Sequence, residues 1–169
     1  SLEGYVIFIT KGDENIGSGH IYRTITLASE INSYKKIIFC KKNNLSQGIF
    51  DNYEYEFFNY KNIPEIIKKI SNYKIKAIVI DKLETDIQEF IELKKLSCPL
   101  ISMEDYGDAA ILYADKIINS LYETSIDISK LYSGYKYEVI MNYFRTFCGE
   151  INKLKISNNF LSKSFNNKL

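Results

Sequence analysis

The stretch Asn15-Ile16-Gly17-Ser18-Gly19-His20-Ile21-Tyr22-Arg23 holds the only histidine of the chain, within a loop that carries two closely spaced glycines. An apolar run at residues 5–9 precedes it, and apolar residues with helical spacing follow it from 21 to 31. This order predicts a strand, a glycine loop and a helix. Glycines let the backbone turn tightly and let a ligand approach closely, while the unpaired N–H groups of a helix start favour an anion.

His20 falls in the first turn of the predicted helix, beside the expected anion site. The partial positive charge of a helix start disfavours an imidazolium, so we expect His20 to be largely neutral near pH 7. A neutral imidazole can take a proton from water or from a hydroxyl group. The alternative is structural: Gly17 and Gly19 make only a turn, Ser18 caps the helix, and His20 fills a gap in the packing.

The composition favours one globular domain and excludes several functional classes. The chain has 169 residues, 46% of them hydrophobic, and its 22 Lys and Arg balance its 21 Asp and Glu. Because the charges are interleaved, we expect no nucleic-acid partner and no anionic membrane surface. No apolar run approaches the roughly 20 residues of a membrane helix, and Ser1-Leu2-Glu3-Gly4 does not resemble an export signal. These features predict a cytoplasmic protein without membrane insertion.

The three cysteines, Cys40, Cys98 and Cys148, are far apart and lie in mostly apolar surroundings. They show no Cys-x-x-Cys spacing, so they are predicted to be buried, reduced thiols. With a single histidine, a zinc site would need an unusual set of ligands. We therefore predict no metal and no other cofactor.

Two common nucleotide-binding loops do not fit the sequence. A dinucleotide loop reads Gly-x-Gly-x-x-Gly and has an acid after the second strand, but Tyr22 stands at the third glycine and Lys41-Lys42 follow the second strand. A Walker A loop would need Lys-Ser/Thr where Ser18-Gly19 stands. The sequence thus argues against NAD binding and against a P-loop ATPase.

Short apolar runs alternate with amphipathic segments along the chain, which predicts an α/β fold: a Rossmann-like, mainly parallel sheet with helices on both faces. Strands are expected at residues 5–9, 35–40, 53–60, 76–81, 99–103 and 116–119. Helices are expected from about 20, from 64, over 83–96 and over 109–114. A polar loop is expected at 41–44, and another loop is expected from Ser120. The residues expected to face the sheet from the helix over 83–96 are Ile87, Phe90, Ile91 and Leu93-Leu96.

Three segments place polar side chains at the carboxyl edge of this predicted sheet. The His20 loop follows the first strand, Asp81 ends another, and Glu104-Asp105 end the next. Parallel sheets bind ligands beyond this edge, so the three segments together predict a ligand site. The alternative is that the acids only cap the helices that follow them.

Four ordered segments resemble a known family. Residues 16–23, followed by Leu27-Ala28, resemble the glycine-histidine-arginine loop of the UDP-sugar hydrolases of pseudaminic acid biosynthesis (PseG) and of the related spore-coat polysaccharide proteins of SpsG type. Two further segments resemble the SpsG-like branch and lie at residues 80–83 and at 103–107 leading to 114–122. The fourth segment, at 132–137 leading to 144–145, resembles the passage of this family toward its second domain. Such an ordered set is more specific than any single motif.

This resemblance implies one half of a glycosyltransferase-B-like architecture, in which a nucleotide sugar lies between two Rossmann-like halves. Residues 1–147 would be the N-terminal domain, and residues 148–169 a linker or terminal segment toward a C-terminal nucleotide-binding domain. In the pseudaminic enzymes the loop histidine is the proposed base that activates water for attack on the anomeric carbon. His20 is the matching residue, and alone the chain is expected to be inactive.

The chain departs from the pseudaminic enzymes at three positions. It has Ile9 and Lys11 where those enzymes have an arginine and an aspartate, and Leu83 where they have a tyrosine. The sugar and the nucleotide base therefore stay open.

The leading hypothesis is a UDP-sugar hydrolase domain of surface polysaccharide or nonulosonic acid biosynthesis, with a nucleotide sugar as substrate. His20 is the candidate base, and the predicted substrate contacts are Gly17, Ser18, Gly19, Arg23, Asp81, Glu104 and Asp105. Arg23 either contacts an anion or pairs with an acid. One alternative is a glycosyltransferase in which His20 deprotonates an acceptor hydroxyl; another is a non-catalytic domain that docks onto a sugar-activating partner enzyme, such as a cytidylyltransferase.

Overall fold

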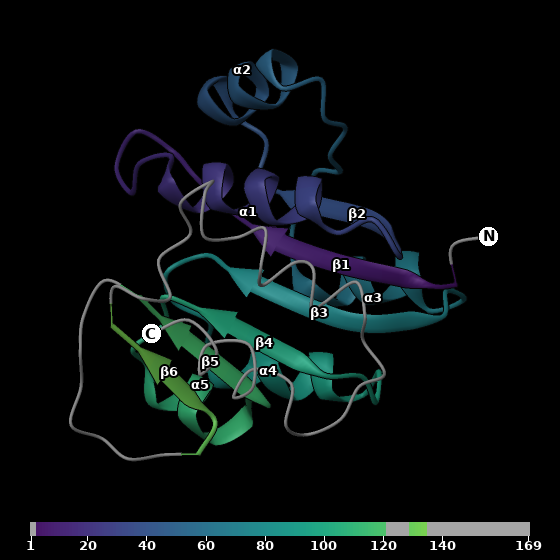
Figure 1. The fold of residues 1–169 in the computed structure, drawn as a ribbon, viewed down its shortest axis with the longest axis vertical. Coiled ribbons are helices and arrows are strands. Elements are labelled where there is room, and N and C mark those ends of the chain that lie inside the picture. Colours follow the sequence, from purple (N-terminus) through teal and green to yellow (C-terminus); the bar gives the residue numbers. More distant parts are fainter. Residues whose placement is uncertain (1–2, 121–128, 135–169) are drawn as a thin grey trace, which may run out of the picture.

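A parallel sheet organises the computed structural model, which describes residues 3–120 and 129–134 (Figure 1). Within these residues the sheet has six strands, and each pair of neighbours is parallel. In spatial order they are β2 (Lys35–Cys40), β1 (Tyr5–Thr10), β3 (Ile75–Asp81), β4 (Leu100–Met103), β5 (Lys116–Asn119) and β6 (Leu131–Ser133). The Rossmann-like α/β fold predicted from the sequence is confirmed.

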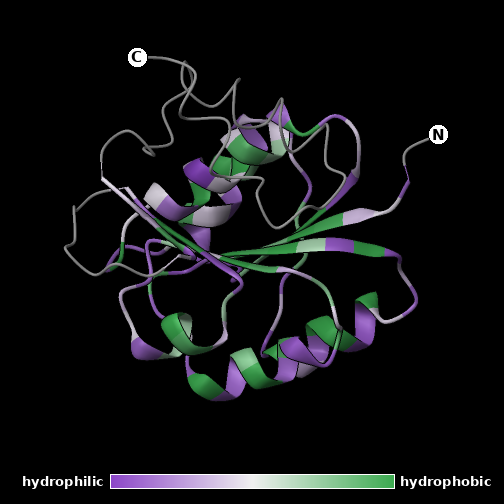
Figure 2. Cartoon of the chain, turned by 60° about the horizontal axis from the view of Figure 1, so that its bottom comes forward, coloured by the Kyte–Doolittle hydropathy of each residue, from purple (hydrophilic) through white to green (hydrophobic). Residues whose placement is uncertain are grey.

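Helices cover both faces of the sheet, which Figure 2 shows close to edge-on. The first face carries α1 (Gly19–Glu30) and α2 (Asn44–Asn52). The second face carries α3 (Ile63–Ile70), α4 (Ile87–Lys94) and α5 (Asp108–Tyr113). Alternate residues of β1 serve the two cores: Val6 and Phe8 pack on the α1 side, Ile7 and Ile9 on the α3 side. A strand buried on both faces reads as a continuous apolar run.

The strand order reverses between β1 and β3. From β1 the chain passes to β2 on one side of it and then returns to β3 on the other side. The last residues of the two central strands, Thr10 and Asp81, are register partners. Open parallel sheets bind ligands at such a switch point, outside the carboxyl ends of the strands. The loops after β1 and β3 therefore border the natural ligand crevice of this fold.

The prediction of a strand at residues 53–60 is wrong. Only Phe58 pairs with the sheet, through a single parallel bridge to Phe39 of β2. Tyr55 and Phe57 instead pack on the core of the α1 face, and Phe57 stacks on Phe50 of α2 with 4.4 Å between ring centroids. These aromatic side chains gain more by lying under α2 than by extending the edge of the sheet.

The polar loop expected at residues 41–44 contains the start of a helix instead. Asn43 is the N-cap of α2: its side chain accepts a hydrogen bond from the Ser46 N–H, and the Ser46 hydroxyl accepts one from the Asn43 N–H. This reciprocal pair is a capping box, here made by Asn and Ser rather than by the usual Ser/Thr and Glu/Gln. Because these residues differ from the usual pair, the sequence pattern did not predict the start of α2.

The helix expected over 83–96 is shorter. It begins at Ile87 because Asp86 and Glu89 form a second capping box, while Leu83 has a left-handed backbone with φ of 75°. Phe90 and Leu93 face the sheet as expected, but Ile87 and Ile91 are 49% and 37% exposed.

Strand β6 was missed, because its residues fall in the loop expected after Ser120. The expectations for residues 135–147 and for the terminal segment 148–169 lie outside the described residues. Of the three cysteines, Cys40 and Cys98 are buried and free, as predicted, and Cys148 lies outside the described ranges.

Candidate functional site

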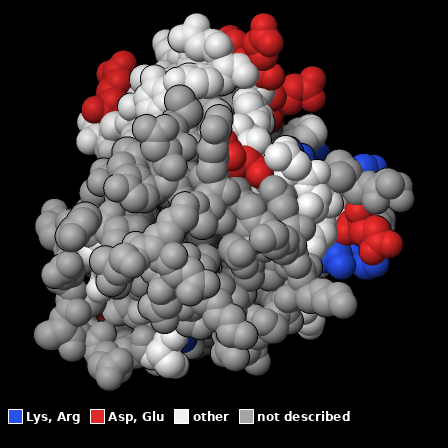
Figure 3. Space-filling view, viewed as in Figure 1, with Lys and Arg blue, Asp and Glu red and all other residues white. Residues whose placement is uncertain are grey.

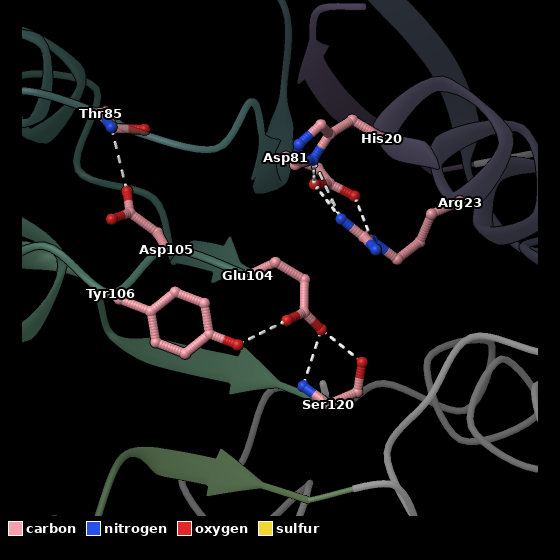
Figure 4. A network of polar contacts seen from close by, with 8 residues as sticks. All are labelled: His20, Arg23, Asp81, Thr85, Glu104, Asp105, Tyr106 and Ser120. Carbon is pink, nitrogen blue, oxygen red and sulfur yellow. Dashed lines mark hydrogen bonds and ion pairs between the residues drawn. The ribbon is translucent and has the colours of Figure 1, made fainter. Parts of the chain in front are cut away.

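Three side chains from α1 and β3 meet at the switch point (Figure 4). His20 Nδ1 lies 2.5 Å from Asp81 Oδ1, and Arg23 donates from Nε to Oδ2 at 2.5 Å and from Nη2 to Oδ1 at 2.6 Å. Arg23 thus grips the carboxylate with two parallel hydrogen bonds. Asp81 is only 1% exposed, so its charge is matched by these partners rather than by water.

The geometry of this cluster follows from the fold. His20 and Arg23 are one helical turn apart and so share a face of α1. Asp81 ends β3 two residues after Val79, which packs in the core beneath α1. Because side chains alternate along a strand, Asp81 points to the same side as Val79, under the first turns of α1. The carboxyl edge predicted to gather His20 and Asp81 does bring them together.

The hydrogen bonds assign the tautomer of His20. An ionised carboxylate can only accept, so the nitrogen 2.5 Å from Asp81 Oδ1 carries the proton and donates it. Arg23 Nη2 lies 3.0 Å from the same Nδ1 and cannot donate to a protonated nitrogen. In the neutral form of the ring, the lone pair is therefore on Nε2. The contacts to Asp81 and Arg23 fix the orientation of the ring.

Arg23 stays charged in this setting. Burial lowers the pKa of its guanidinium, but the charge and hydrogen bonds of Asp81, with smaller contributions from Glu104 and Tyr106, raise that pKa overall. Of the two roles predicted for Arg23, the described structure shows the pairing with an acid.

The glycine loop between β1 and α1 is open on the outside. Gly17 has φ of 78°, a conformation that favours glycine, and a Cβ added at Gly17 or Gly19 would meet no atom of residues 3–120 or 129–134 within 4 Å. Ser18 occupies the N-cap position but its side chain makes no capping hydrogen bond, so the predicted capping role is wrong. The first turn of α1 also lacks an acidic residue. The helix start is thus left uncapped by side chains, as an anion site requires.

Two residues that sequence reasoning did not assign to the site shape this loop. A Cβ at Gly12 would lie 2.6 Å from Ile21 Cδ1, so Gly12 is needed for close packing of the loop on α1. Asp13 Oδ1 accepts hydrogen bonds from the N–H groups of Asn15 and Ile16, at 2.8 and 2.9 Å. These contacts fix the path of the chain into Gly17.

Glu104 forms a second polar cluster, next to the first (Figure 4). Its Oε1 accepts from the Ser120 N–H at 2.7 Å and from the Ser120 hydroxyl, and its Oε2 accepts from the Tyr106 hydroxyl at 3.0 Å. Glu104 is 2% exposed and has a left-handed backbone with φ of 52°. Tyr106 is 49% exposed. Sequence reasoning did not assign Tyr106 or Ser120 to the site, although both lie in segments that carry the family resemblance.

Asp105 has a different environment. Its carboxylate accepts from the Thr85 N–H at 3.0 Å and the Gly107 N–H at 2.9 Å, which ties the loop after β3 to the loop after β4. Burial raises the pKa of Asp105, and these hydrogen bonds oppose the rise. Neither Asp81 nor Asp105 caps a helix: Asp86 caps α4, and Gly107 precedes α5.

Charges on the visible described surface are mixed. Figure 3 shows acidic side chains toward the top, where α2 lies, and acidic and basic side chains next to one another at the right. Within residues 3–120 and 129–134, no group of three or more His, Cys, Asp or Glu side chains is placed to hold a metal ion. In the same part of the chain, no helix combines the length and apolarity needed to cross a bilayer.

Comparisons with known proteins found a sequence relative and similar solved structures. No protein-family model matches the chain. The chain is 25% identical over 174 aligned positions to the uncharacterized protein MJ1062 of Methanocaldococcus jannaschii, covering 95% of this chain and 34% of that protein. The Anabaena protein HepE, solved in complex with UDP and glucose, superposes with a TM-score of 0.50 at 9% identity, over 70% of this chain and 38% of HepE. A second HepE structure, with UDP, gives a TM-score of 0.45.

The chain spans about a third of the length of MJ1062 and 38% of HepE. At 9% identity the likeness to HepE concerns the fold alone. The chain is a Rossmann-like α/β domain that shares its fold with part of a protein solved with UDP and glucose.

Proposed function

We propose that this chain is the N-terminal half of a nucleotide-sugar enzyme of glycosyltransferase-B-like architecture, and that it resembles the SpsG and PseG proteins in function. The reaction is hydrolysis of a UDP-sugar in surface polysaccharide or nonulosonic acid biosynthesis, in the cytoplasm and without a cofactor. One observation carries the proposal: His20 is held through Nδ1 by Asp81, beside an uncapped helix start at the switch point of the sheet. Its Nε2 is the proton acceptor.

His20 acts on the attacking water. Nε2 takes a proton from the water while the water oxygen bonds to the anomeric carbon, and the bond from that carbon to the diphosphate oxygen breaks. UDP leaves with the electron pair, and the sugar is released with a free anomeric hydroxyl. Asp81 stabilises the imidazolium that forms, through the 2.5 Å contact to Nδ1.

The open loop suits the diphosphate. Gly17, Ser18 and Gly19 lead into the start of α1, whose unpaired N–H groups and partial positive charge favour an anion. The absence of a side chain at Gly17 and Gly19 leaves room for phosphate oxygens against the backbone. Negative charge that develops on the leaving oxygen is stabilised there.

Of the two predicted acids, Glu104 is the better sugar contact. It lies in the polar cluster next to His20 and Asp81, and an ionised carboxylate can accept a hydrogen bond from a sugar hydroxyl. Asp105 uses both carboxylate oxygens to hold neighbouring loops, so we assign it a supporting role. Tyr106 and Ser120 then set the position of Glu104 beside the sugar.

A second domain completes the site. MJ1062 is about three times as long as the aligned segment, and HepE is more than twice as long, which supports a longer native protein. The complex of HepE with UDP and glucose supports the substrate class. We assign most nucleotide contacts to that second domain or to a partner enzyme, and we expect inefficient turnover by this chain alone.

The test uses the full-length product of the gene, incubated with UDP-N-acetyl sugars and assayed for UDP release. His20→Asn is expected to reduce turnover by about 100-fold or more, because general base catalysis contributes on that order. Tyr22→Phe is the matched control, since Tyr22 lies on α1 and is 42% exposed. Wild-type turnover by His20→Asn, with free sugar as product, would show that another group is the base.

Product analysis separates hydrolysis from transfer. A free sugar identifies a hydrolase, while a new glycoside in the presence of an acceptor identifies a glycosyltransferase in which His20 deprotonates a hydroxyl. If the full-length protein neither binds nor converts any nucleotide sugar, and its complex with a sugar-activating enzyme survives His20→Asn, the chain is a docking domain.

A further inference from the structure

We infer that Arg23 is a positioning residue: it supplies the counter-charge to Asp81 and thereby keeps the imidazole of His20 free to accept a proton. The inference rests on the proposed function, in which His20 is the base. It replaces the predicted contact between Arg23 and the substrate with a role exerted through Asp81.

The need for a counter-charge follows from the contact between His20 and Asp81. A carboxylate 2.5 Å from a ring nitrogen favours the imidazolium, because opposite charges at that distance attract strongly. Asp81 is 1% exposed, so solvent screens little of this attraction. An imidazolium has no lone pair to offer to water.

Arg23 removes this difficulty by forming the ion pair itself. Its Nε and Nη2 bind both oxygens of Asp81, and Nη2 lies 3.0 Å from His20 Nδ1. A fixed positive charge beside the ring disfavours a second proton on it. The arrangement that results is an Arg23–Asp81 ion pair to which a neutral imidazole donates from Nδ1. Arg23 is itself shielded, with a side chain 13% exposed.

Other charged groups near the cluster leave this balance in place. From the loop after β4, the negative charge of Glu104 favours the charged form of Arg23, and the Glu104 carboxylate is held by donors from Ser120 and Tyr106. Lys82 directly follows β3, and its ammonium pairs with Glu89 of α4. The start of α1 adds a partial positive charge that also favours the neutral ring.

Arginine suits this position better than lysine. A guanidinium offers a rigid fork that matches both carboxylate oxygens and stays charged at every accessible pH. A lysine ammonium is a point charge that would hold one oxygen at a time. The fork fixes the carboxylate plane, and that plane in turn fixes the direction of the Nδ1–H bond.

The test measures the protonation of His20 directly, since it is the only histidine among the 169 residues. Imidazole nitrogen signals of this chain are followed by NMR from about pH 5 to about pH 9. Arg23→Gln is expected to move the titration midpoint upward by about one pH unit or more, and Asp81→Asn to move it downward. Lys68→Gln is the matched control: it removes the same charge from an exposed residue of α3, on the other face of the sheet, and should leave the midpoint unchanged.

An unchanged or lowered midpoint in Arg23→Gln would overturn the inference. The wild-type chain gives a test that does not depend on whether the variant folds. Near pH 7.5 its nitrogen shifts must show a neutral ring with the proton on Nδ1, and an imidazolium there would refute the role of Arg23.

The activity arm uses the full-length protein. Arg23→Gln is expected to shift the acidic limb of the pH profile of kcat/KM upward, so that lost activity returns as the pH rises. A merely structural role would lower activity equally at every pH. The two proposals can fail separately. Wild-type activity of His20→Asn would contradict the proposed function, while an unchanged NMR titration midpoint in Arg23→Gln would contradict only the role of Arg23.

Discussion

Gly19 occupies the first position of α1, with open space where a side chain would be. Its φ is outside the left-handed region, so alanine fits the backbone. We expect Gly19→Ala to leave the melting temperature unchanged or slightly higher, because alanine favours helix over glycine by up to about 1 kcal/mol. The new methyl group stands beside the N–H groups that we assign to the diphosphate. Calorimetric titration should therefore show that the full-length variant binds UDP-sugar at least about tenfold more weakly.

Gly48 offers a control of the same kind. It lies within α2, and a Cβ added there also meets nothing within 4 Å. Gly48→Ala should stabilise the helix by a similar amount and leave binding unchanged. Equal binding of UDP-sugar by the wild type and both variants would show that the diphosphate does not bind at the start of α1.

At the scale of single residues, the sequence predicts which side chains belong to the candidate site better than it predicts the contacts between them. His20 and Asp81 could be assigned to one edge because parallel strands end together, and the structure places them 2.5 Å apart. The grip of Arg23 on Asp81 could not be predicted, since it depends on how α1 is rotated over β3. The hydrogen bond from Tyr106 to Glu104 could not be predicted either, because it depends on the left-handed backbone at Glu104.

Among the elements, α2 depends on its capping box. Asn43→Ala removes the acceptor for the Ser46 N–H and also the bond from Asn43 Nδ2 to the Gly12 carbonyl, which joins α2 to the glycine loop at 2.6 Å. We expect the free energy of unfolding, measured in urea, to fall by about 1–2 kcal/mol. Asn62→Ala is the comparison: Asn62 caps α3 by one exposed bond to the Glu65 N–H, so about 0.5–1 kcal/mol is expected. Equal losses would mean that the tie to the loop contributes nothing.

The errors at the element scale have one physical origin. The spacing of apolar residues indicates which side chains are buried, but not which neighbouring element buries them. Residues 53–60 have enough aromatic content for a strand, yet Phe57 is satisfied by Phe50 of α2. Ile87 and Ile91 have the spacing of a buried stripe, yet α4 turns Phe90 and Leu93 inward. Local capping residues, rather than apolar spacing, decide where such helices begin.

For the whole molecule, two buried thiols link stability to pH. Burial raises the pKa of Cys40 to about 12 and that of Cys98 to about 11. An unfolded thiol has a pKa of about 8.5, so unfolding releases protons above that pH. The free energy of unfolding contributed by these groups is complete below about pH 8.5 and falls as the pH rises toward 11.

Urea unfolding near pH 8 and near pH 10 measures this effect. The wild-type chain should lose more stability over that interval than Cys40→Ala/Cys98→Ala, in which both groups are removed. Parallel pH dependence in the two proteins would show that the thiols are not buried in solution. The double variant will also be less stable at both pH values, because it leaves small cavities.

At this largest scale the fold class is the most predictable property. Alternating apolar and amphipathic segments specify a parallel sheet, and the order of the strands then follows from few topologies. The position of the switch point between β1 and β3 is a consequence of that order. The residues that the proposed second domain would contribute cannot be predicted from this sequence, so the substrate is less defined than the fold.

The bond between His20 and Asp81 joins residues 61 positions apart. Within the described residues, the strands of the sheet that creates this bond pair in parallel, and each parallel pair needs a long crossover. During synthesis, the imidazole leaves the ribosome long before the carboxylate that orients it exists. In a nascent chain, His20 therefore lacks its hydrogen bond to Asp81 until β3 pairs with β1. The proposed site is complete only when the central part of the sheet has been assembled.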